Sequence, residues 1–143
     1  MISIDTNIFV YAVNADCSLC KTARDFLYSL RTNTDVLLSE YIMVELYMCL
    51  RNPAIFEKPL GPAQASGICT RYKENPHWQY GGYESSITNE FWKKASMPNV
   101  PFRRVIDIRL ALTLTYQGVT EFATVNTKDF ENCGFLKVWN PLH

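Results

Sequence analysis

The chain has 143 residues, of which 48% are hydrophobic and 20% charged, and its formal net charge is zero. These values predict one globular domain, residues 1–143, and exclude both a disordered chain and a nucleic-acid binder that depends on a basic excess alone. Because there is no basic leader, no long apolar run and an odd number of cysteines, five, we also expect a cytoplasmic protein with free thiols and no membrane segment.

Short strands and amphipathic helices are predicted to alternate along the chain. The first strand, Ile2-Ser3-Ile4, ends at Asp5, and apolar residues recur at helical spacing from Ile8 onward. Hydrophobic periodicity, capping residues and breakers predict further strands over residues 35–38, 77–83, 122–125 and 136–139, and helices over 18–31, 40–51, 62–74, 85–95 and 103–117. This alternation indicates an α/β fold with a central parallel sheet of four to five strands flanked by helices.

Two helix starts and one helix face are predicted in more detail. Ser39 is expected to cap the helix over residues 40–51, and Ser85 or Ser86 the helix over 85–95. The helix over 103–117 is expected to bury one apolar side, made of Val105, Ile108, Leu112 and Tyr116 with Ala111 and Leu114 beside them.

Four carboxylates stand where strands end or helices begin. Asp5 follows the first strand, and Glu45 lies in the helix after the second. Asp107 lies near the start of the helix over 103–117, and Asp129 follows a late strand. Sites in open α/β sheets lie outside the carboxyl ends of the strands, so these acids are placed to meet.

Each of these acids also has a purely structural explanation. Asp5 can cap the helix that follows it. Asp107 can pair with Arg103 or Arg104 one helical turn away, and Glu45 can lie on a solvated flank. Several acids at compatible positions without histidine nevertheless favour a hard cation that prefers oxygen ligands, Mg²⁺ or Mn²⁺. Such an ion would neutralise the acids, polarise a phosphate and activate water.

Five stretches of the sequence, in order over nearly the whole chain, carry a resemblance to a known family: Ile4-Asp5-Thr6-Asn7-Ile8-Phe9, Ser39-Glu40-Tyr41-Ile42-Met43-Val44-Glu45, Asp107-Ile108-Arg109-Leu110-Ala111, Phe122-Ala123-Thr124-Val125-Asn126-Thr127-Lys128-Asp129-Phe130 and Val138-Trp139-Asn140-Pro141. The chain resembles a PIN domain of the VapC type, the toxin ribonuclease of bacterial toxin–antitoxin pairs. The resemblance implies a PIN-like fold and endonucleolytic cleavage of RNA that depends on Mg²⁺ or Mn²⁺.

The resemblance also implies roles for individual residues. Asp5, Glu45 and Asp107 would be the acids of the metal site. Thr6 would hold a carboxylate or position a water on the metal, although a plain turn hydroxyl is the alternative. Asn7 would orient the ligands without itself binding the metal, although an Asx turn explains this residue at least as well.

The fourth acid of the site is left open by the sequence. Many PIN domains have an acid at the position of Asn126, whereas here the nearest acid is Asp129. Because Mg²⁺ prefers anionic oxygen ligands, we expect Asp129 to be the fourth ligand and Asn126 to support it.

The implied partners are an RNA substrate, a cognate antitoxin protein that covers the acids with an inserted arginine, and a second copy of the chain in a homodimer. The basic residues nearest the acids in sequence, expected to hold RNA, are Arg103, Arg104, Arg109 and Lys128. The apolar residues expected to contact the antitoxin are Val10, Tyr11, Tyr47 and Met48.

Three other functions fit parts of the pattern. A haloacid-dehalogenase-like phosphatase also begins with an Asp at a strand end, but it needs a second acid where Asn7 stands. A phosphoacceptor domain needs its acceptor at the end of a mid-chain strand, whereas Asp35 begins one. A catalytically inactive PIN fold that acts as a binding module is the third, and the intact set of acids argues against it.

Overall fold

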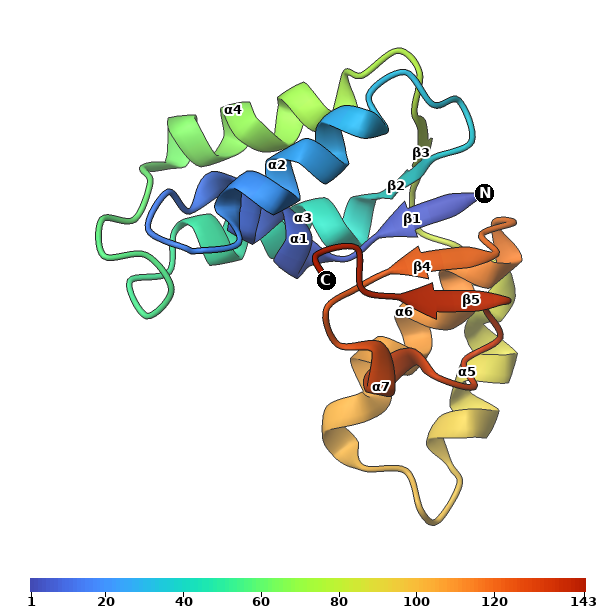
Figure 1. Ribbon diagram of the computed structural model, residues 1–143. Helices are drawn as coiled ribbons and strands as arrows, with labels where there is room; N and C mark the ends of the chain where they lie inside the picture. The colour runs from blue at the N-terminus through green and yellow to red at the C-terminus, as the bar shows by residue number, and fades with distance from the viewer.

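A parallel sheet of five short strands runs through the computed structural model, which describes all residues 1–143. The strands are β1 Ile2–Ile4, β2 Leu37–Ser39, β3 Gln79–Gly81, β4 Glu121–Ala123 and β5 Lys137–Trp139. β1 pairs with β4 and β4 with β5, β2 pairs with β3, and a single parallel bridge between Ile2 and Val36 joins the two groups. The order across the sheet is therefore β3-β2-β1-β4-β5 (Figure 1), which confirms the predicted α/β fold with a parallel sheet.

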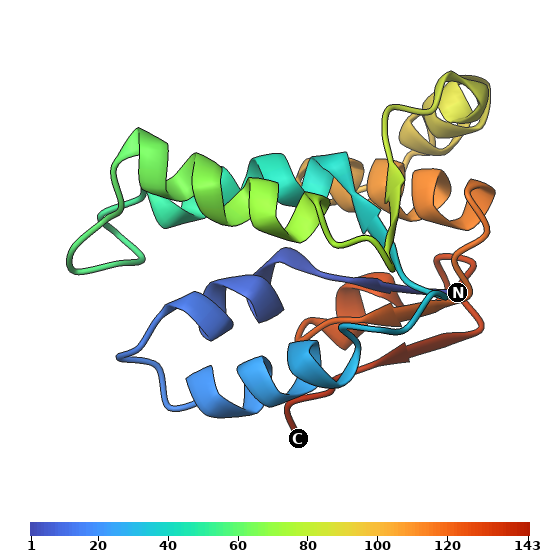
Figure 2. The same ribbon diagram turned by 90° about the horizontal axis from the view of Figure 1, so that it is seen from above.

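Helices cover both faces of this sheet. They are α1 Thr6–Val13, α2 Cys20–Ser29, α3 Glu40–Leu50, α4 Pro62–Lys73, α5 Thr88–Ala95, α6 Val105–Tyr116 and α7 Thr127–Phe130, with single 3₁₀ turns η1 Ser85–Ile87 and η2 Phe102–Arg104. Figure 2 shows α2 on one face and α3, α4 and α6 on the other, while α1 continues from β1 and packs against both α2 and α3. None of the helices has the length and apolar character needed to span a bilayer. All five cysteines are free thiols, as predicted.

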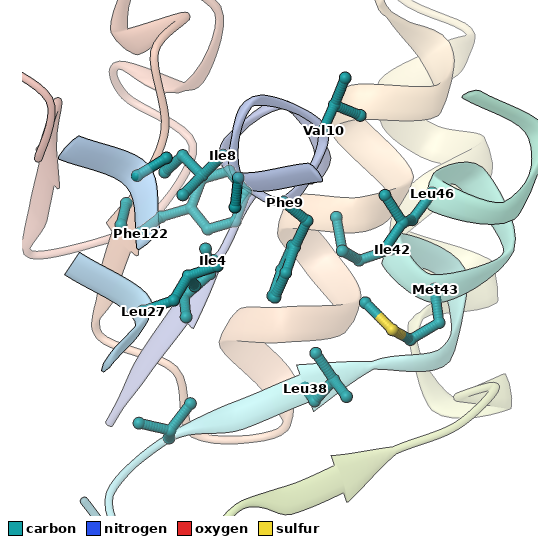
Figure 3. Packing of buried hydrophobic residues seen from close by; sticks show 14 of the residues in the cluster. Ile4, Ile8, Phe9, Val10, Leu27, Leu38, Ile42, Met43, Leu46 and Phe122 are labelled. Carbon is teal, nitrogen blue, oxygen red and sulfur yellow. The ribbon is translucent and has the colours of Figure 1, made fainter. Parts of the chain in front are cut away.

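The core lies between the start of α1, α3 and the sheet. Phe9 of α1 and Ile42 of α3 are fully buried, and they point toward Ile4 and Leu38 on neighbouring strands (Figure 3). Fully burying an apolar side chain of this size stabilises the fold by roughly 1.5–3 kcal/mol. This packing holds the first turns of α1 and α3 against the ends of β1 and β2, and so positions the acids that follow those strands.

The apolar helix near residue 105 differs from its prediction in both its start and its buried face. The helix starts at Val105, after η2, and not at residue 103. Leu110, Ala111 and Leu114 are buried, whereas Tyr116 is 60% exposed. Apolar residues occur nearly all round this helix, so their spacing does not select one face. The neighbouring elements α5, η1 and α7 all contact this helix, so its buried face depends on tertiary packing and not on the spacing of apolar residues alone.

Two predicted helix caps differ from the structure. Ser39 does precede α3, but its side chain makes no capping hydrogen bond, because it is buried as the last residue of β2. Ser85 and Ser86 lie inside η1 and do not cap it. The cap is Glu84, whose Oε1 accepts a hydrogen bond from the Ser86 backbone N–H at 3.0 Å. Ser85 and Ser86 were predicted as caps from residue type alone. The longer acidic side chain of Glu84, one residue before Ser85, makes the capping hydrogen bond instead.

Candidate active site

The four predicted acids line one cavity of about 350 Å³ at the carboxyl ends of the strands. Asp5 comes directly after β1, Glu45 projects from α3, Asp107 from the first turn of α6 and Asp129 from α7. The three predicted supporting residues, Thr6, Asn7 and Asn126, line the same cavity. The fold therefore brings together all seven residues that the sequence singled out.

Asp5 is the most buried of the acids, with 8% of its surface exposed. Its Oδ1 accepts a hydrogen bond from the Thr6 backbone N–H at 2.8 Å, which makes it the N-cap of α1, and its Oδ2 accepts one from the Thr124 hydroxyl at 2.6 Å. Burial raises the pKa of Asp5 to about 6; the bonds from Thr124 and Thr6 oppose this shift, and the charges of Glu45 and Asp107 add to it. The structural role of Asp5 as a cap thus coexists with its place in the cavity.

Glu45 is tied to the same short segment. Its Oε2 accepts a hydrogen bond from the Thr6 hydroxyl at 2.8 Å. Burial raises the pKa of Glu45, the bond from Thr6 opposes the shift, and the charge of Asp107 adds to it. Thr6 therefore connects the two acids, through its backbone N–H to Asp5 and through its hydroxyl to Glu45. We call Asp5 and Glu45 the inner pair; neither forms a salt bridge with a basic group.

Asp107 and Asp129, which we call the outer pair, share one arginine. Arg104 Nε lies 3.6 Å from Asp107 Oδ2, and Arg104 Nη1 lies 3.5 Å from Asp129 Oδ1. Arg104 Nη2 also donates a hydrogen bond to the backbone carbonyl of Asp129. Burial raises the pKa of Asp107, Arg104 opposes the shift, and Asp129 adds to it. The ion pair predicted as the structural explanation for Asp107 is present, and Asp107 lines the cavity all the same.

Thr124 belongs to the site but was not expected from the sequence. Ile4 pairs with Ala123 across β1 and β4, so the next residues along each strand, Asp5 and Thr124, lie side by side. Thr124 is fully buried, and its oxygen also accepts a hydrogen bond from the Asn126 backbone N–H at 3.0 Å. A threonine directly after a buried strand was the only signal in the sequence, and it has meaning only once the two strands are known to be neighbours.

The basic residues predicted to lie near the acids are separated by the fold. Only Arg104 pairs with an acid of the site. Arg109 lines a neighbouring cavity, Arg103 lies over the Phe102 ring, and Lys128 is exposed. Of the apolar residues predicted as partner contacts, Val10 and Tyr11 line the acid cavity, and Tyr47 and Met48 do not.

The cavity offers mainly oxygen atoms to a ligand. Asn7 Oδ1 is buried and has no hydrogen-bond partner, and its side chain lines the cavity beside Asp5. An orphaned buried carbonyl oxygen of this kind costs free energy unless a donor, a water or a cation satisfies it. No three His, Cys, Asp or Glu side chains have the spacing of a complete metal site in the present arrangement.

Comparison with known proteins identifies the family. No family model matches the sequence, so the assignment rests on individual related proteins. The chain is 41% identical over 142 residues to Ribonuclease VapC24 of Mycobacterium tuberculosis, an alignment that covers 99% of this chain and 97% of that protein.

Solved structures show the same fold at lower identity. They include VapC20 of Mycobacterium tuberculosis, a sarcin–ricin loop cleaving toxin, with a TM-score of 0.69, 14% identity and coverage of 94% of this chain and 96% of that one. FitAcB from Neisseria gonorrhoeae has a TM-score of 0.67 and 20% identity over 100% and 99% of the two chains. VapBC2 from Rickettsia felis, bound to a DNA fragment from its promoter, has a TM-score of 0.60 and 18% identity over 98% of each chain. With the full-length relationship to VapC24, the chain belongs to the VapC family of toxin ribonucleases, which have the PIN-domain fold.

Proposed function

We propose that this chain, acting as one PIN domain over residues 1–143, is the toxin of a toxin–antitoxin pair and cleaves RNA endonucleolytically with a bound Mg²⁺ or Mn²⁺ ion. One observation carries the proposal: four acids from separate elements line one cavity, and the two most buried, Asp5 and Glu45, have no basic partner. Burying carboxylates without compensation costs folding free energy. A cation bound during function explains why the fold accepts this cost.

The donors in the cavity fit a hard cation. Carboxylate oxygens that already accept one hydrogen bond retain acceptor capacity, so the bonds to Asp5 and Glu45 leave room for an ion. The orphaned Asn7 Oδ1 adds a neutral oxygen for the ion or one of its waters. The proposed ligands are Asp5, Glu45, Asp107 and Asp129. When bound, the ion supplies Lewis-acid polarisation of a phosphate and lowers the pKa of water.

The side chains around these acids hold them in place. The Thr6 hydroxyl fixes Glu45, and the Thr124 hydroxyl fixes Asp5, at 2.8 Å and 2.6 Å respectively. Arg104 fixes Asp107 and, through the backbone carbonyl, the position of Asp129 on α7. Partners of this kind orient metal ligands, and their loss typically lowers metal affinity or activity 10–100-fold.

The proposed partners are an RNA substrate and a cognate antitoxin, with a homodimer as the working form in the cytoplasm. The structural relatives include FitAB bound to an IR36 DNA fragment and VapBC2 bound to promoter DNA. In this chain Val10 and Tyr11 border the acid cavity, where an antitoxin would contact them while its arginine pairs with the acids. Co-expression with the adjacent upstream reading frame is expected to relieve toxicity and to yield a complex that purifies together; two separate proteins would contradict the antitoxin assignment.

Cleavage of a structured RNA with Mg²⁺, Mn²⁺ or EDTA tests the catalytic part of the proposal. The wild type is expected to cut with either ion and not with EDTA. The cleavage activity of Asp5→Asn and of Glu45→Gln is expected to fall about 10²–10³-fold or more, because each change removes a negative charge from the proposed metal ligands. Asp16→Asn is the matched control, because Asp16 is exposed in a turn outside the cavity.

Two outcomes would contradict the assignment. Undiminished cleavage by correctly folded Asp5→Asn would show that these acids are not the catalytic site. A wild type that binds RNA or its antitoxin but cuts nothing with either ion would instead favour the inactive binding module. Circular dichroism of each variant separates loss of activity from loss of fold.

A further inference from the structure

A second cavity, of about 220 Å³, lies directly beside the acid cavity. Tyr41, Ile106 and Leu110 line both, so a ligand that occupies one reaches the other without crossing the core. The outer wall of the second cavity comes from Tyr83 and Glu84, in the segment between β3 and η1. Figure 2 shows this segment beside α6, the helix that carries Asp107. We call this second cavity the Tyr83 cavity.

The Tyr83 cavity presents flat aromatic and guanidinium surfaces to solvent. Tyr83 is 75% exposed and Tyr41 40% exposed, although both are large and partly apolar. The Arg109 guanidinium carbon lies 5.1 Å from the centre of the Tyr83 ring and 5.4 Å from that of Phe91. These cation–π contacts hold Arg109 and Tyr83 together at the cavity wall. Aromatic rings and arginine planes of this kind are the surfaces on which proteins stack unpaired bases.

The charges around the Tyr83 cavity favour a base over a phosphate. Arg109 is its one basic residue, whereas Glu40 and Glu84 are both acidic. Two carboxylates against one guanidinium disfavour a second phosphate, but they accept hydrogen bonds from the amino groups of a nucleobase. Glu40 forms no salt bridge, and Oε1 of Glu84 accepts a hydrogen bond from the Ser86 backbone N–H. The edge of uracil has one N3–H donor flanked by two carbonyl oxygens, which a carboxylate repels, and no amino group, so uracil suits this wall least.

We propose that the Tyr83 cavity binds one unpaired nucleobase of the RNA, next to the cleaved phosphodiester, and selects adenine, cytosine or guanine over uracil at that position. The base stacks on Tyr83 and Arg109, and its amino group faces Glu40 or Glu84. Tyr41, on the border of both cavities, separates this base from the acids. The inference rests on the proposed ribonuclease activity of the acid cavity.

Cut-site mapping on hairpin RNAs with a randomised loop tests the proposal. The wild type is expected to exclude uracil at one position beside the cut. Tyr83→Ala is expected to lose that preference and to lower kcat/KM about 10-fold or more, since stacking on an aromatic ring contributes roughly 1–3 kcal/mol per base. Tyr83→Phe keeps the ring and is expected to keep the preference. Tyr116→Ala is the matched control, because Tyr116 is 60% exposed on α6 and lines neither cavity.

The outcomes separate this inference from the proposed function. Cleavage by the wild type with a sequence preference that Tyr83→Ala leaves unchanged overturns the base site alone. The same holds for cleavage that tolerates uracil at every position around the cut. Absence of cleavage by the wild type overturns the ribonuclease function and this inference with it. The Mn²⁺ concentration for half-maximal activity is expected to be the same in Tyr83→Ala and wild type, because Tyr83 does not line the acid cavity.

Discussion

The inner and outer pairs of acids in one cavity are stabilised by different groups. Asp5 and Glu45, the inner pair, are held only by hydroxyl and backbone donors from Thr6 and Thr124. Asp107 and Asp129, the outer pair, are more exposed and share the guanidinium of Arg104. The inner acids therefore keep their negative charge uncompensated, whereas the outer acids already have a cation of the protein beside them.

This difference indicates where an added cation gains most. At the inner pair an ion relieves the cost of burying two charges, and burial and like charge raise the pKa of both acids. At the outer pair an ion must compete with Arg104, whose charge opposes the shift at Asp107. We therefore expect the inner pair to dominate the affinity for the ion and the outer pair to adjust it.

Among the residues that hold the acids in place, removing the hydroxyl that bonds to Asp5 is expected to have the largest effect. Thr124→Val deletes the 2.6 Å bond to Asp5 Oδ2 and leaves the shape of the side chain nearly unchanged. Because this bond orients the carboxylate and favours its charged form, Mn²⁺ affinity should fall about 10–100-fold. Calorimetric titration measures the change. Thr113→Val is the control, since the Thr113 hydroxyl bonds only to the Arg109 carbonyl of its own helix; equal effects of the two variants would remove the special role of the inner pair.

The cost of the inner charges should be measurable as stability in metal-free protein. The pKa of Asp5 is about 6 in the folded state against 3.8 for an ordinary aspartate, so ionised Asp5 disfavours folding. Well below pH 3.8 Asp5 is protonated in both states and there is no penalty; the penalty grows between pH 3.8 and about 6 and is constant above that. Asp5→Asn, which cannot ionise, should therefore unfold like wild type at low pH and be about 1–3 kcal/mol more stable at pH 8. Urea denaturation at both pH values decides, and a difference that is independent of pH would contradict the assignment.

Comparing Asp129 with Asn126 tests which of the two residues serves as the fourth ligand of the site. Both line the cavity, but only Asp129 brings a charge. Asp129→Ala is expected to raise the Mg²⁺ requirement about 10-fold, equivalent to about 1.4 kcal/mol, and excess ion should partly restore cleavage. Asn126→Ala should change it less. If the order is reversed and Asp129→Ala behaves as wild type, the site has three acids and Asp129 serves only to shape the turn.

The smallest expected effect is at Arg104. Arg104→Gln removes the cation shared by the outer pair, and these groups are partly exposed, so the loss of stability without metal should be about 0.5–1 kcal/mol. Added Mn²⁺ should then raise the melting temperature of Arg104→Gln more than that of wild type, because the ion replaces the missing charge. Arg103→Gln is the neighbouring control, since Arg103 contacts no acid. A smaller rise in Arg104→Gln than in wild type would show that Arg104 does not compete with the ion.

Most of the secondary structure was predictable because its signals are local. Asp5 ends a strand of β-branched residues, and Pro62 begins α4 where a first-turn proline is tolerated. The positions of the four acids relative to strands and helices follow from the same signals. Errors occurred where several residues satisfy the same local rule. The serines before η1 and the apolar residues all round α6 are the two cases.

The sequence by itself determined the alternation of strands and helices and the place of each acid along it, because hydrophobic period and turn chemistry act over a few residues. Only the tertiary structure decided which of these residues meet. Thr124 reaches Asp5 because β4 pairs with β1, although 119 positions separate them. Arg104 contacts the outer pair because η2 directly precedes α6, and Tyr83 lies beside Arg109 because α6 packs against η1. Such contacts depend on strand order and helix packing, which follow from burying the whole core at once.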